Sequence, residues 1–315
     1  MSYHNSDMST FSAPAKIILF GEHAVVYGQP AIAIPFASLR AQVHVEKNTP
    51  AGQGLMIAAE DLHRTIGLED EDNVLAYTVR IILDRLESPP PDVTITLRSP
   101  IPVASGLGSG AAIAAALGRA LSTTVNRSLT DDALNQMVYE IEKMHHGTPS
   151  GIDNTVIVYE QPVYFIREQP IQRLHIKHPF QLVVADTGEN APTRLAVGDV
   201  RKLYEAHPAR VQPVLDSIGE LVRRARQINE HGQPDMLGPL MNQNHAFLQQ
   251  LTVSSPKLDL FVNTAMQAGA LGAKLSGGGR GGNMIALVQP DTALSVEQSL
   301  HDAGAVRIYH TTATA

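Results

Sequence analysis

The 315-residue sequence predicts an α+β fold of two lobes with a cleft between them. Strand-like runs dominate the first half, helical periodicity dominates the second half, and a glycine-rich turn followed by a further strand comes near the end. We place the boundary between the lobes near residue 180. The predicted lobes are therefore residues 1–180 and 181–315.

Short apolar runs, several of them alternating or β-branched, predict the strands of both lobes. They cover residues 16–20, 41–45, 93–97, 155–159, 163–166, 181–185 and 284–288. The clearest helix begins after Thr130, a good N-cap residue, and its apolar residues recur every three or four positions until His146. An alanine-rich helix follows Ser109, and residues 200–250 predict two or more amphipathic helices interrupted around residues 232–235.

Composition excludes several classes of protein. The chain carries 24 basic and 31 acidic residues, a formal charge of -7, and its Lys and Arg are scattered, which argues against a nucleic-acid partner. It has no cysteine, which excludes disulfide scaffolds, thiolate metal sites and cysteine nucleophiles. The first residues lack a basic and then apolar signal, and the small apolar stretch at 111–121 is too short to span a bilayer. We expect a cytoplasmic protein with no membrane partner.

The turn at residues 102–112 places three glycines and two serines directly before the alanine-rich helix. Glycines let the backbone approach a ligand, and N–H groups at a helix N-terminus attract phosphate. The turn therefore predicts an anion site, with a plain helix-entry turn as the alternative. The residues expected at this site are Pro102, Ser105, Gly106, Leu107, Gly108, Ser109, Gly110 and Ala111.

Competing motifs in this turn fit less well. Residues 106–111 match the G-x-G-x-x-A form of the dinucleotide fingerprint, but Pro100 and Pro102 separate the preceding strand from the glycines. No Lys-Ser or Lys-Thr follows the glycines, so this is not a Walker loop, and the sequence has no G-x-S-x-G elbow.

A second glycine-rich loop, residues 274–283, is expected between a helix and a strand, with five glycines among residues 277–282. An ordinary hairpin needs one or two glycines only, although a flexible hairpin stays the alternative. Two such loops in one chain predict a nucleoside triphosphate as ligand.

Charged residues next to these loops suit phosphoryl transfer, which needs a cation, a magnesium ligand and a group that orients or deprotonates a hydroxyl. Lys16 stands at the start of an apolar strand, and Glu22 and His23 follow that strand. Asp153 lies in a Gly- and Pro-containing turn at the expected mouth of the next strand, where it would serve as a general base. Glu142, on the preceding helix, is a magnesium candidate.

These segments together resemble the GHMP superfamily of small-molecule kinases, and within it the mevalonate kinase family. The most specific block is residues 13–28, APAKIILFGEHAVVYG, and the resemblance continues through residues 106–112, 146–154 and 274–282. It implies a ribosomal-protein-S5-like N-terminal lobe and a ferredoxin-like C-terminal lobe. It also implies ATP-dependent phosphorylation of mevalonate in isoprenoid biosynthesis, with Mg²⁺, and suggests a homodimer.

The resemblance also implies roles for individual residues. Lys16 and Asp153 would act at the substrate hydroxyl, Glu142 and Ser109 would hold Mg²⁺, and the ATP site would include the first loop and Gly277, Gly278 and Gly279. The expected substrate contacts are Glu22, His23, Ser150 and Thr193. Two residues depart from the family pattern: Gly110 stands where a second serine is usual, and Arg280 interrupts the glycines of the second loop.

Three alternatives stay open from the sequence. One is another GHMP enzyme, such as a phosphomevalonate kinase, a homoserine or sugar-acid kinase or a mevalonate-pathway decarboxylase, although residues 21–23, Gly-Glu-His, favour mevalonate. The second is a ligand-binding relative without catalysis. The third is a nicotinamide-dependent enzyme, which would bind NAD and ignore ATP.

Overall fold

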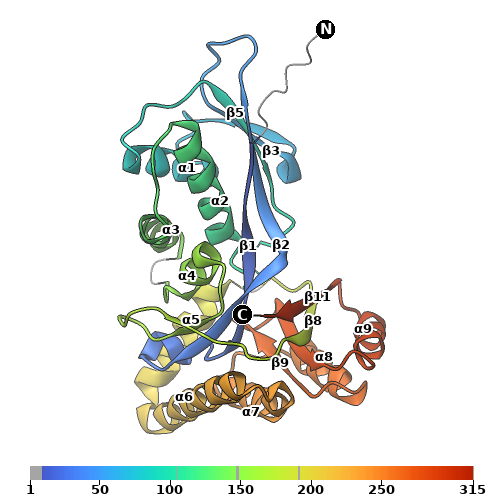
Figure 1. Cartoon of the computed structure of the whole chain (residues 1–315). Coiled ribbons are helices and arrows are strands. Elements are labelled where there is room, and N and C mark those ends of the chain that lie inside the picture. The colour runs from blue at the N-terminus through green and yellow to red at the C-terminus, as the bar shows by residue number, and fades with distance from the viewer. Residues whose placement is uncertain (1–8, 104, 147–148, 191, 315) are drawn as a thin grey trace.

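The structure is a computed structural model that describes residues 9–103, 105–146, 149–190 and 192–314. Its two lobes each contain one sheet, and the long strands β1 (Ser9–Phe20) and β2 (Ala31–Lys47) run from the far end of the first lobe down into the second (Figure 1). The predicted α+β fold of two lobes is therefore confirmed.

The first sheet has the strand order β4-β3-β5-β2-β6-β7, with β1 paired to β2. All its pairs are antiparallel except β3 with β5, and Lys16 of β1 lies opposite Pro35 of β2. The remaining strands are β3 (Met56–Ala59), β4 (Arg64–Gly67), β5 (Val93–Arg98), β6 (Val163–Phe165) and β7 (Gln172–Arg173).

Helices cover one side of this sheet (Figure 1). They are α1 (Val74–Arg85), α2 (Ser109–Thr124), α3 (Asp131–His146) and α4 (Ile152–Tyr159). Helix α2 packs closely on β1 and β2 because the side chains it buries are mostly alanines. The hydroxyl of Thr130 accepts a hydrogen bond from the Ala133 N–H at 3.2 Å, which confirms the predicted cap of α3.

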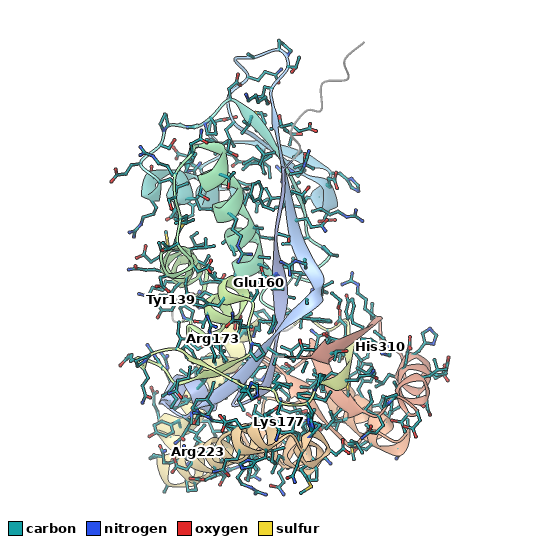
Figure 2. All side chains as sticks on the ribbon, in the orientation of Figure 1. Tyr139, Glu160, Arg173, Lys177, Arg223 and His310 are labelled. Atoms are coloured by element: carbon teal, nitrogen blue, oxygen red, sulfur yellow. The ribbon has the colours of Figure 1, made fainter. Side chains whose placement is uncertain are left out.

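Glu160, labelled in Figure 2, ties three elements of this lobe together. It follows α4, and its carboxylate accepts hydrogen bonds from Arg40 of β2 at 2.9 and 3.0 Å and from Arg119 of α2 at 2.6 Å. The two guanidinium groups lower the pKa of Glu160 against the effect of its partial burial. This cluster fixes the end of α4, which carries Asp153 in its first turn.

The second sheet is antiparallel, with the order β11-β8-β10-β9. Its strands are β8 (Phe180–Asp186), β9 (Gly272–Ser276), β10 (Asn283–Val288) and β11 (Arg307–Ala313). The helices of this lobe are α5 (Thr193–Ala206), α6 (Pro208–His231), α7 (Leu237–Gln250), α8 (Pro256–Gln267) and α9 (Ala293–Asp302). Three short 3₁₀ turns, η1 (Ala24–Tyr27), η2 (Glu60–Leu62) and η3 (Pro234–Met236), connect elements in the two lobes.

Two sequence predictions about local structure are wrong. Residues 155–159 belong to helix α4 and not to a strand. Nearly every side chain of this short helix is buried, so its β-branched run has no polar face to reveal a helical period. The second glycine loop joins strands β9 and β10, and Lys274 lies within β9. The predicted interruption near residue 232 is confirmed, because α6 ends at His231 and Gly232 takes φ 76°.

One hydrophobic core connects the lobes, since a single cluster of buried side chains extends from Ala13 in β1 to Ala313 in β11. No helix within the described ranges is long and apolar enough to cross a membrane.

Candidate active site

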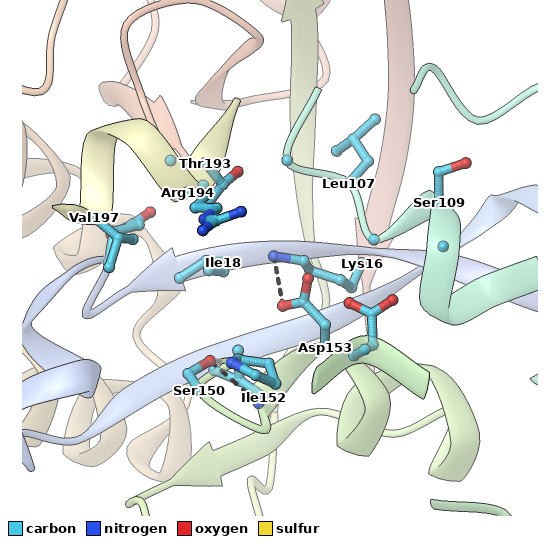
Figure 3. Close-up of a pocket in the computed structure, with 18 of the residues that line it drawn as sticks. Lys16, Ile18, Leu107, Ser109, Ser150, Ile152, Asp153, Thr193, Arg194 and Val197 are labelled. Atoms are coloured by element: carbon cyan, nitrogen blue, oxygen red, sulfur yellow. Dashed lines mark hydrogen bonds and ion pairs between the residues drawn. The ribbon is translucent and has the colours of Figure 1, made fainter. Parts of the chain in front are cut away.

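A cavity of about 730 Å³ lies where β1, the glycine turns and helices α2, α3, α4 and α5 meet (Figure 3). Most of the residues singled out in the sequence border it. They are Lys16, Glu22, His23, Pro102, Ser105, Gly106, Leu107, Gly108, Ser109, Gly110, Glu142, Ser150, Asp153, Thr193, Gly277 and Gly278. Ala111 and Gly279 do not: Ala111 is fully buried inside α2, and a Cβ on Gly279 would meet the Val253 carbonyl oxygen at 2.0 Å.

Lys16 and Asp153 form an ion pair in this cavity, with 2.9 Å between Nζ and Oδ1 (Figure 3). Lys16 lies inside β1, not at its start, and its side chain is only 3% exposed, whereas that of Asp153 is 32% exposed. Asp153 lies in the first turn of α4, not at the mouth of a strand. The pair therefore has one buried cation and one carboxylate that a substrate can reach.

The two glycine loops touch each other through bare backbone. A Cβ on Gly106 would lie 3.4 Å from the Gly277 Cα, and one on Gly277 would lie 3.2 Å from the Gly106 Cα. Both residues have positive φ, 81° and 92°. Glycine is needed here for the backbone angle and for the close approach. The Lys16 N–H also donates to the Leu107 carbonyl at 3.0 Å, which holds the first loop beside the ion pair.

The first loop leads into the N-terminus of α2, where backbone N–H groups and the helix dipole favour an anion. A Cβ on Gly110 would lie 2.9 Å from Glu142 Oε1. A serine at position 110 would therefore press against the Glu142 carboxylate. The glycine leaves room for that carboxylate at the edge of the cavity.

Glu142 is buried, and burial first and the nearby Asp153 second raise its pKa to about 7, against the effect of Lys16. Among the described residues no group of three or more His, Cys, Asp or Glu could hold a metal. Mg²⁺ needs fewer protein ligands, because one or two carboxylates combine with water and substrate phosphates. The oxygen donors of Glu142, Asp153 and Ser109 are hard ligands of that kind, so the residues fit this ion.

Glu22 borders the cavity, but its carboxylate is engaged within the wall. Lys274 of β9 donates to Oε1, and Asn244 of α7 donates to Oε2 at 3.3 Å. Both ionic side chains are fully buried. Burial lowers the pKa of Lys274, and pairing with Glu22 opposes that shift. The expected contact of Glu22 with substrate stays a prediction, and the observed contact joins the two lobes.

His23 links the same segment to the second glycine loop. Its backbone has φ 61°, and the protonated Nε2 donates to the Gly278 carbonyl at 2.9 Å. Burial lowers the pKa of His23 to about 4. The imidazole is therefore neutral near pH 7 and acts here as a hydrogen-bond donor.

Helix α5 forms the remaining wall. Thr193 packs on the second loop, since a Cβ on Gly278 would lie 2.9 Å from its Oγ1. Arg194, Val197 and Arg201 follow at helical spacing and also border the cavity. Sequence reasoning missed these three residues. The available signal was the spacing of Arg194 and Arg201, which are seven positions apart and so share one face of a helix.

Arg280 points away from the cavity and pairs with α5. Its Nη1 donates to Asp199 Oδ2 at 2.5 Å and its Nε to the Thr252 carbonyl at 3.4 Å. It holds φ 61° in a run of glycines, a backbone conformation that costs a residue with a side chain about 1 to 2 kcal/mol. Its contacts with α5 and with the α7–α8 turn hold it in this conformation.

Comparisons with known proteins agree with this geometry. The profile of the GHMP kinases N terminal domain matches residues 73–161, and that of the GHMP kinases C terminal domain matches residues 220–306. The fold and the site thus define a GHMP-type small-molecule kinase.

Similarity to individual proteins identifies the family within this class of kinases. A mevalonate kinase of Thermococcus sibiricus is 36% identical, with 94% of each chain covered, and one of Pyrococcus abyssi is 37% identical, with 93% of this chain and 92% of the relative covered. The L. major mevalonate kinase, solved with R-mevalonate, superposes with a TM-score of 0.85 at 30% identity, covering 100% of this chain and 99% of that one. The chain belongs to the mevalonate kinase family.

Proposed function

We propose that the protein transfers the γ-phosphoryl group of ATP to the 5-hydroxyl of mevalonate, which gives 5-phosphomevalonate and ADP for isoprenoid and lipid biosynthesis. The observation that carries this proposal is the Lys16–Asp153 ion pair, held beside two touching glycine loops in one cavity. The family relationship supports mevalonate over the other acceptors of the superfamily.

In this proposal each wall of the cavity has one task. The loop at residues 102–110 and the α2 N-terminus bind the phosphates through backbone N–H groups, with Gly277 and Gly278 opposite. Asp153 accepts the proton of the attacking hydroxyl as the new O–P bond forms and the bond to the ADP oxygen breaks. The Lys16 ammonium lies beside Asp153 and stabilises the negative charge that develops on the phosphoryl group during its transfer.

Mg²⁺ bound with the nucleotide would neutralise phosphate charge. We assign it to Glu142 and to Ser109, which both border the cavity. The hydroxyl of Ser109 donates to the Ile101 carbonyl at 3.3 Å, which leaves its oxygen able to accept or ligate.

The acceptor side contains a countercharge that suits mevalonate. Mevalonate carries a carboxylate, and Arg194 and Arg201 border the cavity on α5, where neither pairs with a carboxylate of the described chain. A guanidinium binds a carboxylate with directional, charge-assisted hydrogen bonds. We assign the acceptor side to α5, Ser150 and the segment around His23, and the nucleotide side to residues 105–110, the N-terminus of α2 and the second glycine loop.

Two further assignments rest on the family alone. We propose a cytoplasmic location, where ATP is abundant, and a homodimer, which sedimentation of the purified chain would test.

The test of the function is ADP release coupled to NADH oxidation, with mevalonate, phosphomevalonate, homoserine and several sugars as acceptors. We expect turnover with mevalonate alone, a product mass of mevalonate plus one phosphate, and loss of turnover in Asp153→Asn. The absence of ADP release with every acceptor would overturn the kinase assignment. Turnover with a different acceptor only would replace mevalonate and keep the chemistry.

A further inference from the structure

Helix α5 supplies the acceptor wall, yet it is weakly anchored. It buries only Ala196 and Val200 fully, and its main packing partner is α6. Elements with few buried apolar contacts sit at the low end of local stability. Leu203 and Tyr204 also pack partly buried against the core, but they lie in the second half of the helix, so we expect the position of Thr193 and Arg194 to depend on other contacts as well.

The strongest such contact comes from the second glycine loop. The guanidinium of Arg280 pairs with Asp199, which also accepts from Lys202 at 3.2 Å. Asp199 is not among the α5 residues that border the cavity, and it lies on the opposite side of the helix from Arg201, which follows two residues later. Arg280 thus connects the loop that faces the nucleotide to the helix that faces the acceptor.

The second glycine loop is itself held in place by several contacts, so it can fix the position of α5. The Arg280 N–H donates to the Val253 carbonyl at 2.7 Å, and the Gly282 N–H donates to the Glu189 carbonyl at 2.9 Å. His23 and Gly106, both of the N-terminal lobe, contact Gly278 and Gly277 of this loop. A residue fixed at several points by its surroundings can sustain the unfavourable φ of Arg280.

We propose that Arg280 is a positioning residue, which holds α5 at the acceptor side of the cavity through its ion pair with Asp199. This inference rests on the proposed function for its kinetic consequences but not for its structural ones. Without the ion pair, α5 would shift away from Lys16 and Asp153 while the nucleotide loops keep their mutual contact. Small errors in placing a substrate have large effects on its reaction.

Arg280→Gly is the informative variant, because it removes the ion pair and at the same time removes the strain of a side chain at positive φ. We expect the KM for mevalonate to rise about tenfold, with the KM for ATP within twofold of wild type and the melting temperature little changed. Asp199→Asn should have a similar effect, and the double variant should be no worse than either single one. Arg280→Lys, which keeps the charge, should recover part of the loss.

Lys202→Ala is the matched control, because Lys202 binds the same carboxylate from the exposed side. It should leave both KM values unchanged. An unchanged KM for mevalonate in Arg280→Gly would overturn the proposal. An equal rise in the KM for ATP would also overturn it, because Arg280 would then act on the phosphates. Additive effects of the two substitutions in the double variant would overturn it as well.

A readout without substrate separates this inference from the function. Hydrogen exchange of the intact chain should be faster in residues 193–206 of Arg280→Gly than in the same residues of wild type. Exchange in residues 208–231 should be the same in both proteins. Equal exchange of α5 in both proteins would overturn the ion pair as an anchor. A wild-type protein that turns over no mevalonate but shows the expected exchange would contradict the function and leave the anchor standing.

Discussion

Two lysine–carboxylate pairs lie near each other in this protein, and their surroundings differ. Lys16 and Asp153 meet at 2.9 Å with the carboxylate 32% exposed to the cavity. Lys274 and Glu22 meet with neither side chain exposed at all. The same two functional groups therefore border an open cavity in one place and join two lobes in the other. Access of the carboxylate to the cavity, and not the presence of an ion pair, is the reason we propose the first pair as the reactive one.

The largest expected effect separates the two pairs by activity. Asp153→Asn removes the group that accepts the hydroxyl proton, and we expect kcat to fall about 10²- to 10⁴-fold. The melting temperature should fall less than in a variant of the buried pair, because the Asp153 end of this pair is 32% exposed to water although Lys16 is only 3% exposed. Steady-state kinetics and calorimetry test both halves. An active Asp153→Asn enzyme would contradict the proposal that the Lys16–Asp153 pair is the reactive one.

The opposite result is expected for the buried pair. Lys274→Met leaves the Glu22 carboxylate buried without its cation, and loss of one partner of such a pair costs roughly 3 to 5 kcal/mol. Urea unfolding measures this free energy of unfolding. The double variant Glu22→Gln with Lys274→Met is the control, since it removes both charges and should recover part of the loss. A Lys274→Met protein as stable as wild type would show that the pair is not structural.

His23, next to Glu22, should make the stability of this region depend on pH. Its folded pKa of about 4 lies below the ordinary value of 6.5, so the unfolded chain binds more protons between these values. Stability from this group is present above pH 6.5 and is lost as pH falls towards 4. The loss amounts to about 2 kcal/mol between pH 7 and pH 5.

His23→Gln keeps an N–H donor for Gly278 and cannot titrate. Between pH 7 and pH 5 the free energy of unfolding should therefore fall by about 2 kcal/mol more in wild type than in His23→Gln. A constant difference between the two proteins across this range would argue against a buried neutral imidazole.

The smallest effect concerns the open side of the cavity. Arg194→Ala removes a guanidinium from the acceptor wall, and we expect the KM for mevalonate to rise about tenfold. Arg210→Ala, which changes an exposed arginine near the start of α6, is a control of the same chemistry away from the cavity. Initial rates at varied mevalonate measure both. An unchanged KM would place the carboxylate of the substrate elsewhere, with Arg201 as the next residue to change.

Local signals in the sequence predicted much of this arrangement. The cap at Thr130, the alanine-rich α2 and the glycine turn before it depend on neighbouring residues, and the structure contains all three. The pairing of Lys16 with Asp153 across 137 positions followed from family resemblance, and the structure contains this contact. Their catalytic roles stay predictions.

The remaining features depend on tertiary contacts that no local pattern encodes. Residues 155–159 look like a strand because burial on all sides hides the helical period of α4. The role of Glu22 in substrate binding stays a prediction, and its contact with Lys274 was not predictable because the two residues are 252 positions apart. Arg194 and Arg201 carry no motif, and only the placement of α5 brings them to the cavity.

The long strands β1 and β2 have a consequence for how the molecule can be divided. They belong to the first sheet, yet β1 packs on α6, α7 and β9, and β2 packs on β11. The predicted boundary near residue 180 therefore separates two sheets but not two independent folding units. Separating the chain there would remove from the second sheet and its helices the strands they pack on, so we expect neither half to fold without the other.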